Sequence, residues 1–265
     1  MLKSDCYIVI PARYASTRLP GKPLADICGK PMFQHVYERA IACRSAKQVW
    51  LATDDQRILS AAEERNIPCI LTSPDHICGT DRISEAAEKL GLSPEAVIAN
   101  VQGDEPLLEP AMLDELLAPF LEAAPGTVQI STLARPLDPA DPAEATLFAS
   151  PNQVKVVCDN AGRALYFSRA PIPYPRSGHT SGPVFGMAHV GMYAYTGEVL
   201  RKITRLPPSR LEQIEMLEQL RWLENGFSIH VRLTMFASIS VDTLEDLEKA
   251  RTALAATVQD YNKKS

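Results

Sequence analysis

Short apolar runs alternate with longer amphipathic segments over the first half of this chain. The runs predict five strands, at residues 6–10, 48–52, 69–71, 97–101 and 128–133. The segments between them have helical periodicity; in residues 32–43, Phe33, Val36, Ala40 and Cys43 fall on one face. Apolar strands that alternate with such helices indicate a parallel sheet covered on both faces. Ligands bind such sheets beyond the carboxyl ends of the strands.

The second half of the chain has a different pattern. A proline-rich link begins at Pro136, and the segments that follow predict strands at residues 154–158, 164–167, 189–195 and 228–233. One helix is expected from Ser209 to the pair Asn225 and Gly226, and a final helix from about Thr243. In the first of these helices, the spacing of Leu211, Ile214, Leu217 and Leu220 predicts a buried stripe.

Composition excludes several classes of protein. With 265 residues, 46% of them apolar, the chain is long enough for one large α/β domain. A net charge of −5 gives no general attraction to nucleic acid or to an anionic membrane, so an anion site has to be local. No apolar stretch approaches the roughly 20 residues of a membrane span. The amino terminus lacks the layout of a secretory signal, and the six cysteines form no C-x-x-C pair. We therefore expect a cytoplasmic protein with reduced thiols and no zinc site.

The loop after the first strand, residues 11–23, is the most informative segment. It places Arg13, Arg18 and Lys22 among three prolines and a glycine, with Ser16 and Thr17 as further donors. Cations at this edge of a sheet suit a phosphate group. A solvated basic loop is the alternative from local sequence alone. The loop is neither a Walker sequence nor a G-x-G-x-x-G fingerprint, which argues against an NAD dehydrogenase.

Two aspartates follow other predicted strands. Asp104 comes after the strand at 97–101, next to Gly103, and Asp242 lies between the last strand and the final helix. A carboxylate at a strand end suits a magnesium ion that carries nucleotide phosphates. Locally, Asp104 could equally cap a turn and Asp242 could start a helix. No Asp-x-Asp motif stands at a strand end, which argues against a nucleotide-sugar glycosyltransferase.

Several segments together resemble one known family. They are the opening loop, residues 101–106 (Val-Gln-Gly-Asp-Glu-Pro), 166–170 (Tyr-Phe-Ser-Arg-Ala), 189–193 (His-Val-Gly-Met-Tyr), 211–219 and 241–243 (Val-Asp-Thr). In this order they are similar to the 3-deoxy-manno-octulosonate cytidylyltransferases, or CMP-Kdo synthetases, from about residue 7 to 251. The resemblance implies an α/β, Rossmann-like nucleotidyltransferase fold: a central mostly parallel sheet with helices on both faces and a small dimerisation and sugar-binding lobe.

The resemblance also implies an activity. The family joins CMP from CTP to the acidic sugar Kdo for lipopolysaccharide biosynthesis, uses Mg²⁺, releases pyrophosphate and acts as a homodimer. It implies a single domain, with a CTP-binding core at about residues 1–136 and 226–260 and the lobe at about 150–225. No nucleic acid or membrane partner is implied. A regulatory protein that binds CTP without catalysis is a hypothesis from another class.

Individual roles follow from matching motif positions. Arg13, Lys22, Asp104 and Asp242 would be the catalytic residues, and the two aspartates would ligate the metal. The nucleotide would be bound by Ala12, Arg13, Ser16, Arg18, Lys22, Gly79 and Arg82. The sugar would be bound by Gln102, Arg169, His189, Tyr193, Glu212 and Gln213.

Four of the sugar-binding assignments have a plainer alternative. Arg169 could form a surface ion pair, His189 could be a structural group in a strand, and Glu212 and Gln213 could simply be solvated. Cys78 and Asp81 stand where many relatives have serine and glutamate. This departure leaves the phosphate and metal positions intact, but it keeps an 8-amino analogue of Kdo, or another acidic sugar, open as the acceptor.

Overall fold

The structure is a computed structural model that describes residues 4–15, 19–138, 141–176, 186–237 and 240–264. Two compact units make up the chain, and neither is continuous in sequence. We call the unit of residues 5–93, 98–114 and 238–265 the nucleotide unit, and the unit of residues 1–4, 94–97 and 115–237 the acceptor unit. The sequence predicted a core at 1–136 and 226–260, so the structural units divide the chain at other positions.

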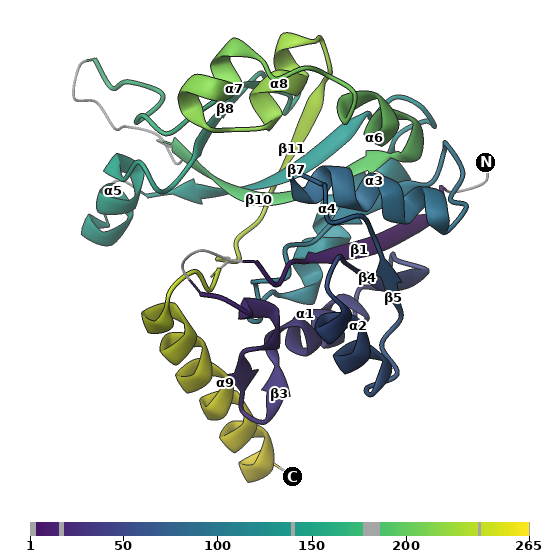
Figure 1. Cartoon of the computed structure of the whole chain (residues 1–265). Coiled ribbons are helices and arrows are strands. Elements are labelled where there is room, and N and C mark those ends of the chain that lie inside the picture. Colours follow the sequence, from purple (N-terminus) through teal and green to yellow (C-terminus); the bar gives the residue numbers. More distant parts are fainter. Residues whose placement is uncertain (1–3, 16–18, 139–140, 177–185, 238–239, 265) are drawn as a thin grey trace. The chain divides into compact units, whose positions relative to one another are not determined.

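The nucleotide unit has the strand and helix alternation expected from the sequence (Figure 1). Its elements are β1 (Cys6–Ala12), η1 (Lys22–Leu24), β2 (Asp26–Ile27), β3 (Lys30–Pro31), α1 (Met32–Ala40), β4 (Gln48–Thr53), α2 (Gln56–Glu63), β5 (Cys69–Leu71), α3 (Gly79–Lys89), most of β6 (Val97–Asn100), the start of α4 (Pro110–Glu122) and α9 (Leu244–Lys264).

The strands of the nucleotide unit lie in the order β6-β1-β4-β5, and β4 pairs in parallel with both β1 and β5. Ile8, Val9 and Ile10 of β1 are all buried, as expected for a strand covered on both faces. α1 and α2 lie on one face of this sheet, and α3, which leads back to β6, lies on the other (Figure 1). The predicted parallel sheet is therefore present.

The carboxyl-terminal helix belongs to the nucleotide unit although it is distant in sequence. α9 packs its Leu247, Ala250 and Leu254 against Ile27 of β2 and Met32 of α1, and Val241 joins this cluster. The β2–β3 hairpin that receives α9 turns through Cys28 and Gly29, which both have positive φ. This packing brings the segment around Asp242 back to the sheet, where the amide of Val241 donates to the carbonyl of Asp104 at 2.8 Å.

The acceptor unit is mixed rather than parallel. It contains the rest of α4 and β7 (Ile130–Leu137), α5 (Pro142–Ala149), β8 (Lys155–Cys158), β9 (Ala164–Ser168), β10 (Gly186–Thr196), α6 (Gly197–Ile203), α7 (Arg210–Glu215), α8 (Gln219–Glu224) and β11 (Ile229–Leu233). β7 pairs in parallel with β11 and antiparallel with β10, and β8 pairs antiparallel with β9 and β10. β10 is long and has a bulge between Val190 and Tyr193.

The single helix predicted from Ser209 to Asn225 is wrong. The chain forms two short helices, α7 and α8, because Met216 between them adopts a left-handed conformation with φ 53°. The predicted apolar stripe is interrupted as a result: Leu217 and Leu220 are buried, but Ile214 is 66% exposed. Trp222 of α8 is buried as well.

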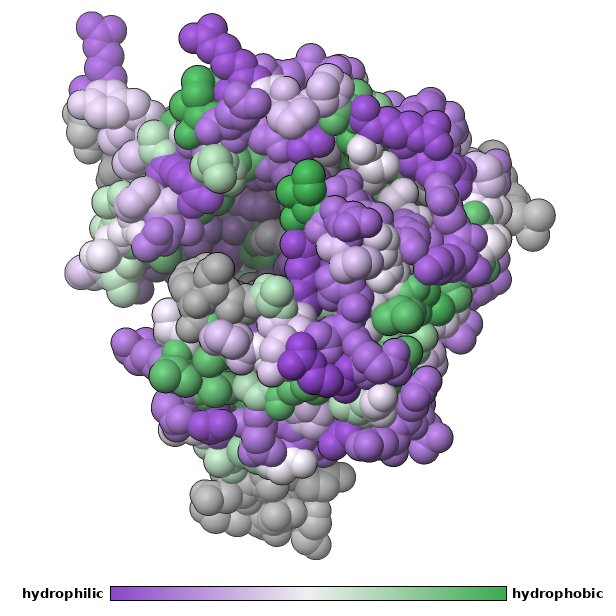
Figure 2. Space-filling view, in the orientation of Figure 1, coloured by the Kyte–Doolittle hydropathy of each residue, from purple (hydrophilic) through white to green (hydrophobic). Residues whose placement is uncertain are grey.

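The described surface has no large apolar face in the view of Figure 2. Hydrophilic residues predominate there, and hydrophobic ones occur in small separate groups. Within the described residues, every helix is too short or too polar to span a lipid bilayer.

Candidate active site

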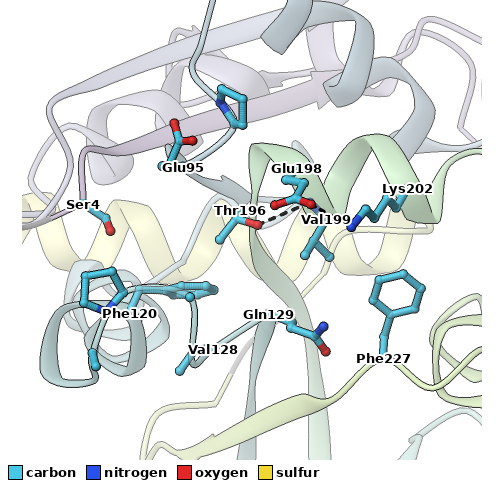
Figure 3. Close-up of a pocket in the computed structure, with 14 residues that line it drawn as sticks. Ser4, Glu95, Phe120, Val128, Gln129, Thr196, Glu198, Val199, Lys202 and Phe227 are labelled. Carbon is cyan, nitrogen blue, oxygen red and sulfur yellow. Dashed lines mark hydrogen bonds and ion pairs between the residues drawn. The ribbon is translucent and has the colours of Figure 1, made fainter.

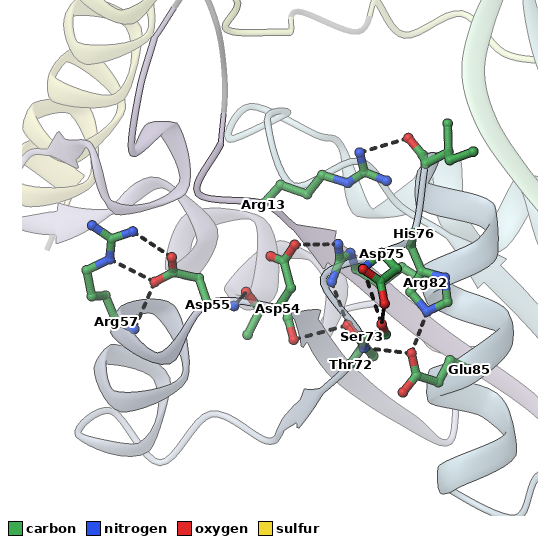
Figure 4. Close-up of polar contacts among 12 residues, drawn as sticks. Arg13, Asp54, Asp55, Arg57, Thr72, Ser73, Asp75, His76, Arg82 and Glu85 are labelled. Carbon is green, nitrogen blue, oxygen red and sulfur yellow. Dashed lines mark hydrogen bonds and ion pairs between the residues drawn. The ribbon is translucent and has the colours of Figure 1, made fainter.

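The loop after β1 begins with Arg13, whose guanidinium has a free donor. Its Nη1 donates to the carbonyl of Ile77 at 2.9 Å (Figure 4). Its Nη2 is buried and, among the residues that the structure describes, meets no hydrogen-bond acceptor. A buried donor that has no acceptor among protein groups costs free energy and suits an anionic ligand.

The loop closes on itself at Tyr14. The amide of Gly21 donates to the carbonyl of Tyr14 at 3.0 Å, and Gly21 has φ +72°, which a residue with a side chain rarely adopts. The Arg57 guanidinium also lies over the Tyr14 ring, 3.2 Å from the centre of the ring. Ser16 and Arg18, predicted to bind the nucleotide, lie outside the described residues.

Lys22, Asp104 and Asp242 meet at one point. The Nζ of Lys22 is 2.7 Å from Oδ2 of Asp104 and 3.1 Å from Oδ1 of Asp242. Burial alone would lower the pKa of Lys22, but the two carboxylates outweigh it and the pKa is raised. The loop, the segment after β6 and the segment before α9 therefore converge on one cluster of charges.

A cavity of about 360 Å³ lies at this cluster. Gly103 lets the segment after β6 lie close to the backbone of β1, because a Cβ at Gly103 would stand 2.8 Å from the carbonyl oxygen of Pro11. A Cβ at Gly79 would make an ordinary contact with the Pro11 ring, at 3.4 Å. Seven residues predicted to bind or process substrates line the cavity, namely Ala12, Arg13, Lys22, Gly79, Gln102, Asp104 and Asp242. Gln102 donates from Nε2 to Oδ1 of Asn100 at 3.1 Å.

Arg82, also predicted to bind the nucleotide, is fully buried in α3 (Figure 4). Its Nη2 is 2.8 Å from Oδ2 of Asp54 and its Nη1 donates to Oγ1 of Thr72. These contacts tie α3 to the segments after β4 and β5. Cys78, the departure from the family pattern, caps the same helix, because its Sγ accepts from the amide of Asp81 at 3.4 Å.

A second polar cluster lies beside this one in α3. Glu85 accepts from the amide of Ser73, pairs with Lys89 at 2.8 Å and makes a short contact with His76 (Figure 4). Burial by itself would raise the pKa of Glu85, but these hydrogen bonds and the charge of Lys89 lower it to about 2. The cluster fixes the segment that presents Ile77 to Arg13.

His189 and Tyr193 lie together on β10 of the acceptor unit. Nε2 of His189 is 2.9 Å from Oγ1 of Thr132, and burial lowers the pKa of this histidine to about 3. The ring of Tyr193 packs against His189 and edge-on against Trp222. Its hydroxyl is buried and has no hydrogen-bond partner within the described part of the chain. Such a hydroxyl is a suitable contact for a polar ligand.

Arg169 follows β9, and backbone carbonyls hold its guanidinium. Nε donates to the carbonyl of Glu215 at 2.8 Å, Nη1 to that of Pro151 at 3.1 Å and Nη2 to that of Met216 at 3.4 Å. The surface ion pair considered from the sequence is thus replaced by contacts with carbonyls. These contacts satisfy donors but do not neutralise the positive charge.

Glu212 and Gln213 are on α7. Glu212 completes a capping box with Ser209 and forms an ion pair with Arg221, so both of its oxygens have partners. Gln213 is exposed. The structure thus gives Glu212 a structural task that the sequence reading overlooked, although Ser209 followed three residues later by Glu212 is a capping-box pattern.

Two aspartates of the cavity carry the donor atoms that a divalent metal ion needs. Asp104 and Asp242 both approach the same cation, the Lys22 ammonium, and carboxylate oxygens are the ligands that Mg²⁺ prefers. No group of three or more metal-ligating side chains occurs within the described residues. Two carboxylates fit Mg²⁺ when substrate phosphates supply further ligands.

The acceptor unit has a second cavity, of about 230 Å³, that contains none of the predicted site residues. Phe120 and Phe227 form apolar walls, and Glu198 pairs with Lys202 at its edge at 2.7 Å (Figure 3). Glu95 lines this cavity as well, so its charged lining has two carboxylates and one ammonium. It therefore offers no unpaired positive charge to a phosphate, unlike the cavity at Lys22, where Nη2 of Arg13 has no acceptor within the described residues.

Known proteins resemble this chain over most of its length. A family model described as cytidylyltransferase matches residues 7–233. The 3-deoxy-manno-octulosonate cytidylyltransferase of Nitratidesulfovibrio vulgaris strain DP4 is 53% identical over 244 residues, which is 92% of this chain and 93% of the relative. That of Lawsonia intracellularis is 47% identical over 253 residues, 96% of this chain and 95% of the relative.

Solved structures agree as well. A structure of CMP:2-keto-3-deoxy-manno-octonic acid synthetase complexed with CTP is 42% identical, has a TM-score of 0.87 and covers 96% of this chain and 100% of its own. A cytidylyltransferase from Leptospira borgpetersenii, only 16% identical with a TM-score of 0.61, covers 96% of this chain and 87% of its own and shares the fold. The Rossmann-like nucleotidyltransferase fold expected from the sequence is confirmed.

Proposed function

Since the chain belongs to the cytidylyltransferase family, and within it to the 3-deoxy-manno-octulosonate cytidylyltransferases, we propose that it transfers CMP from CTP to 3-deoxy-D-manno-octulosonate (Kdo). The products are CMP-Kdo and pyrophosphate. The structural observation that carries this proposal is the meeting of Lys22, Asp104 and Asp242 in the cavity after β1.

The reaction requires positive charge at the phosphates. The anomeric 2-hydroxyl of the sugar attacks the α-phosphate of CTP, the bond to the β-phosphate oxygen breaks, and negative charge grows on the pyrophosphate that leaves. Cations aimed at these oxygens stabilise the transition state more than the ground state. Lys22 and the unpaired Nη2 of Arg13 are such donors, and both line the cavity. Ser16 and Arg18 are proposed for the same task from their motif positions alone.

Asp104 and Asp242 are proposed to hold Mg²⁺ together with phosphate oxygens. Their carboxylates face the ammonium of Lys22. When CTP binds, Lys22 can turn from these carboxylates to a phosphate, because its side chain is long and flexible. When bound, Mg²⁺ supplies a Lewis acid at the phosphates and lowers the pKa of a coordinated hydroxyl.

The other proposed contacts follow the motif positions. Gly79 and Arg82 would lie near the nucleotide, with Arg82 acting mainly through the position of α3, because its guanidinium is occupied by Asp54 and Thr72. Gln102, Arg169, His189, Tyr193, Glu212 and Gln213 are proposed for the sugar. The charge of Arg169 suits the carboxylate of Kdo, and the buried hydroxyl of Tyr193 suits a sugar hydroxyl.

Pyrophosphate release tests the proposal directly. The purified protein is incubated with CTP and Mg²⁺ together with Kdo, 8-amino-Kdo or sialic acid, and pyrophosphate is detected by a coupled enzyme assay. We expect release with Kdo and none when CTP, the metal or the sugar is omitted. Release with 8-amino-Kdo alone would move the proposal to that acceptor. Binding of CTP without turnover on any acceptor would favour the regulatory protein.

The family resemblance further supports a place in lipopolysaccharide biosynthesis, a cytoplasmic location and a homodimer. Light scattering coupled to gel filtration tests the last of these. A mass near twice 29.1 kDa is expected. A mass near 29.1 kDa at assay concentrations would reject the dimer without affecting the proposed reaction.

A further inference from the structure

A buried lysine lies at the start of β8. Lys155 has no exposed surface, and its ammonium donates to the backbone carbonyls of Ser150 at 2.9 Å, Gln153 at 2.6 Å and Arg169. An ammonium has three donors, so these three carbonyls satisfy it completely. A buried charge is costly even when it is hydrogen-bonded. An apolar side chain of the same length would fill the same space but would leave the three carbonyls without this donor. The charge therefore calls for a reason other than packing.

The carbonyls bound by Lys155 come from two segments. Ser150 and Gln153 form the turn between α5 and β8, and Arg169 follows β9. Lys155 thus joins this turn to the backbone of Arg169. The same turn also holds the Arg169 side chain, because the carbonyl of Pro151 accepts from Nη1 at 3.1 Å.

The turn contacts a second proposed sugar residue, His189. The Nε2 of Gln153 donates to the His189 carbonyl at 2.9 Å, and the amide of His189 donates to the carbonyl of Val154 at 2.9 Å. Residues 150–154, which we call the clamp turn, therefore contact Arg169 and His189 and are fixed by Lys155 from the interior.

Glu215 holds Arg169 from the other side. Its carboxylate accepts from the amide of Arg169 at 2.9 Å and from the hydroxyl of Ser168 at 2.6 Å. The cluster of Lys155, Arg169 and Glu215 has two positive charges and one negative charge. This excess of one positive charge favours an anionic ligand. Such a ligand would bind at Arg169, because Arg169 is partly exposed whereas Lys155 is fully buried.

From these contacts we infer that Lys155 is a positioning residue for the acidic sugar: it fixes the clamp turn, and through that turn it orients the guanidinium of Arg169 toward the sugar carboxylate. The inference rests on the proposed function for the identity of the ligand. Lys155 itself has no free donor left and does not touch the sugar.

Lys155→Met removes the ammonium and keeps an unbranched side chain of similar length. At a temperature well below the unfolding transition, we expect the KM for the sugar to rise at least tenfold and the KM for CTP to stay within twofold. Lys202→Met is the matched control, because it removes an exposed lysine of the same unit, and its kinetics should equal the wild type. A folded Lys155→Met protein with an unchanged sugar KM, or with equal rises in both KM values, would overturn the inference.

A double-mutant cycle tests whether Lys155 acts through Arg169. When Arg169→Ala is already present, adding Lys155→Met should change the sugar KM less than twofold, because no guanidinium remains to be oriented. If the two rises in KM multiply instead, Lys155 acts independently of Arg169 and the positioning role is rejected.

Hydrogen exchange provides a readout that needs no activity. In Lys155→Met, amides of residues 150–154 and 169–170 should exchange faster than in the wild type, while those of β4 should not; unchanged exchange at the clamp turn overturns the inference. If Lys155→Met does not fold, Gln153→Ala takes its place, and the KM for the sugar should rise three- to tenfold. An unchanged sugar KM in Gln153→Ala would overturn the inference. Absence of turnover in the wild type would reject the proposed function only, since the exchange measurement still decides the role of Lys155.

Discussion

The ammonium of Lys22 lies 2.7 Å from the carboxylate of Asp104, a residue 82 positions away in the sequence. Asp242 contacts the same ammonium from a further segment. Only the folding of the nucleotide unit brings these three side chains together, and each is open to a separate substitution.

Asp104→Asn keeps the shape of the side chain and removes its charge. We expect the rate of pyrophosphate release to fall 10²–10³-fold, about 3–4 kcal/mol of transition-state stabilisation, with little change in unfolding temperature. The control is Glu122→Gln, which removes an exposed carboxylate that pairs with Arg232. A rate within threefold of the wild type at saturating Mg²⁺ would contradict the role of Asp104.

Lys22→Ala should also impair the use of CTP, by about 10²-fold in kcat/KM. The Lys22 side chain is only 14% exposed and contacts two aspartates, so the substitution should also lower stability. The variant leaves Asp104 and Asp242 to repel each other, so its unfolding temperature should fall by about 2–4 °C. Thermal denaturation with and without MgCl₂ checks this: the metal should restore more stability to the variant than to the wild type. If MgCl₂ raises the unfolding temperatures of the variant and the wild type equally, the two carboxylates do not share a cation.

Gly103→Ala tests the close approach of the segment after β6 to β1. A Cβ there would stand 2.8 Å from the Pro11 carbonyl oxygen, so the backbone has to move, at a cost of about 1–3 kcal/mol. The free energy of unfolding in urea should fall by that amount, and the KM for CTP should rise. Gly191→Ala, where a Cβ meets nothing within 4 Å, serves as the control for stability. Equal stability of the two variants would show that the contact is not restrictive.

Arg82→Met should destabilise the protein strongly. Arg82 is fully buried and pairs with Asp54, so its loss leaves a carboxylate without its cation, at a cost of about 3–5 kcal/mol. Urea denaturation measures the change. Arg57→Met breaks the exposed pair with Asp55 and should cost less than about 1 kcal/mol. If Arg82→Met also costs less than about 1 kcal/mol, the ion pair of Arg82 with Asp54 does not stabilise the fold.

Glu85 should make stability depend on acid pH. Its pKa is lowered from 4.5 to about 2 in the folded protein, so its contribution is present above pH 4.5 and is lost as the pH falls toward 2. The shift corresponds to about 3 kcal/mol. Glu85→Gln should reduce the free energy of unfolding at pH 6 and flatten its decline between pH 4.5 and pH 3, measured by urea denaturation at each pH. An equally steep decline in the variant would assign the acid sensitivity to other carboxylates.

The sequence predicted the nucleotide unit well because its strands are continuous apolar runs. The strand at residues 69–71 has the predicted bounds, and the helix predicted at 32–43 is present as Met32–Ala40. α5 was not predicted, because Pro142 was read as part of a link although proline is well suited to the first turn of a helix.

The break between α7 and α8 could not be predicted from local sequence. Residues 209–225 contain no glycine or proline between the cap and Asn225, so helical spacing continues through the break. The carbonyls of Glu215 and Met216, which a longer helix would use internally, accept from Arg169 instead. A contact 46 residues away in sequence therefore ends the helix.

The site residues were also predicted unevenly, because contacts between residues distant in sequence leave no local pattern. Lys22, Asp104 and Asp242 carry motif signals, and the structure brings them together. Lys155 carried none, because a lysine at the start of an apolar strand usually points to solvent. Its ammonium is held by carbonyls of the preceding turn and of Arg169, which directly follows the adjacent strand β9. Such partners leave no pattern in a sequence.

The left-handed conformation of Met216 affects how the Arg169 guanidinium is held. It leaves two backbone carbonyls as acceptors for Arg169, and backbone atoms cannot be replaced by mutation. Substitutions at residue 216 that favour or disfavour this conformation instead shift both acceptors together. A substitution at this exposed position can thereby change how firmly the Arg169 guanidinium is held, although Arg169 itself is unchanged.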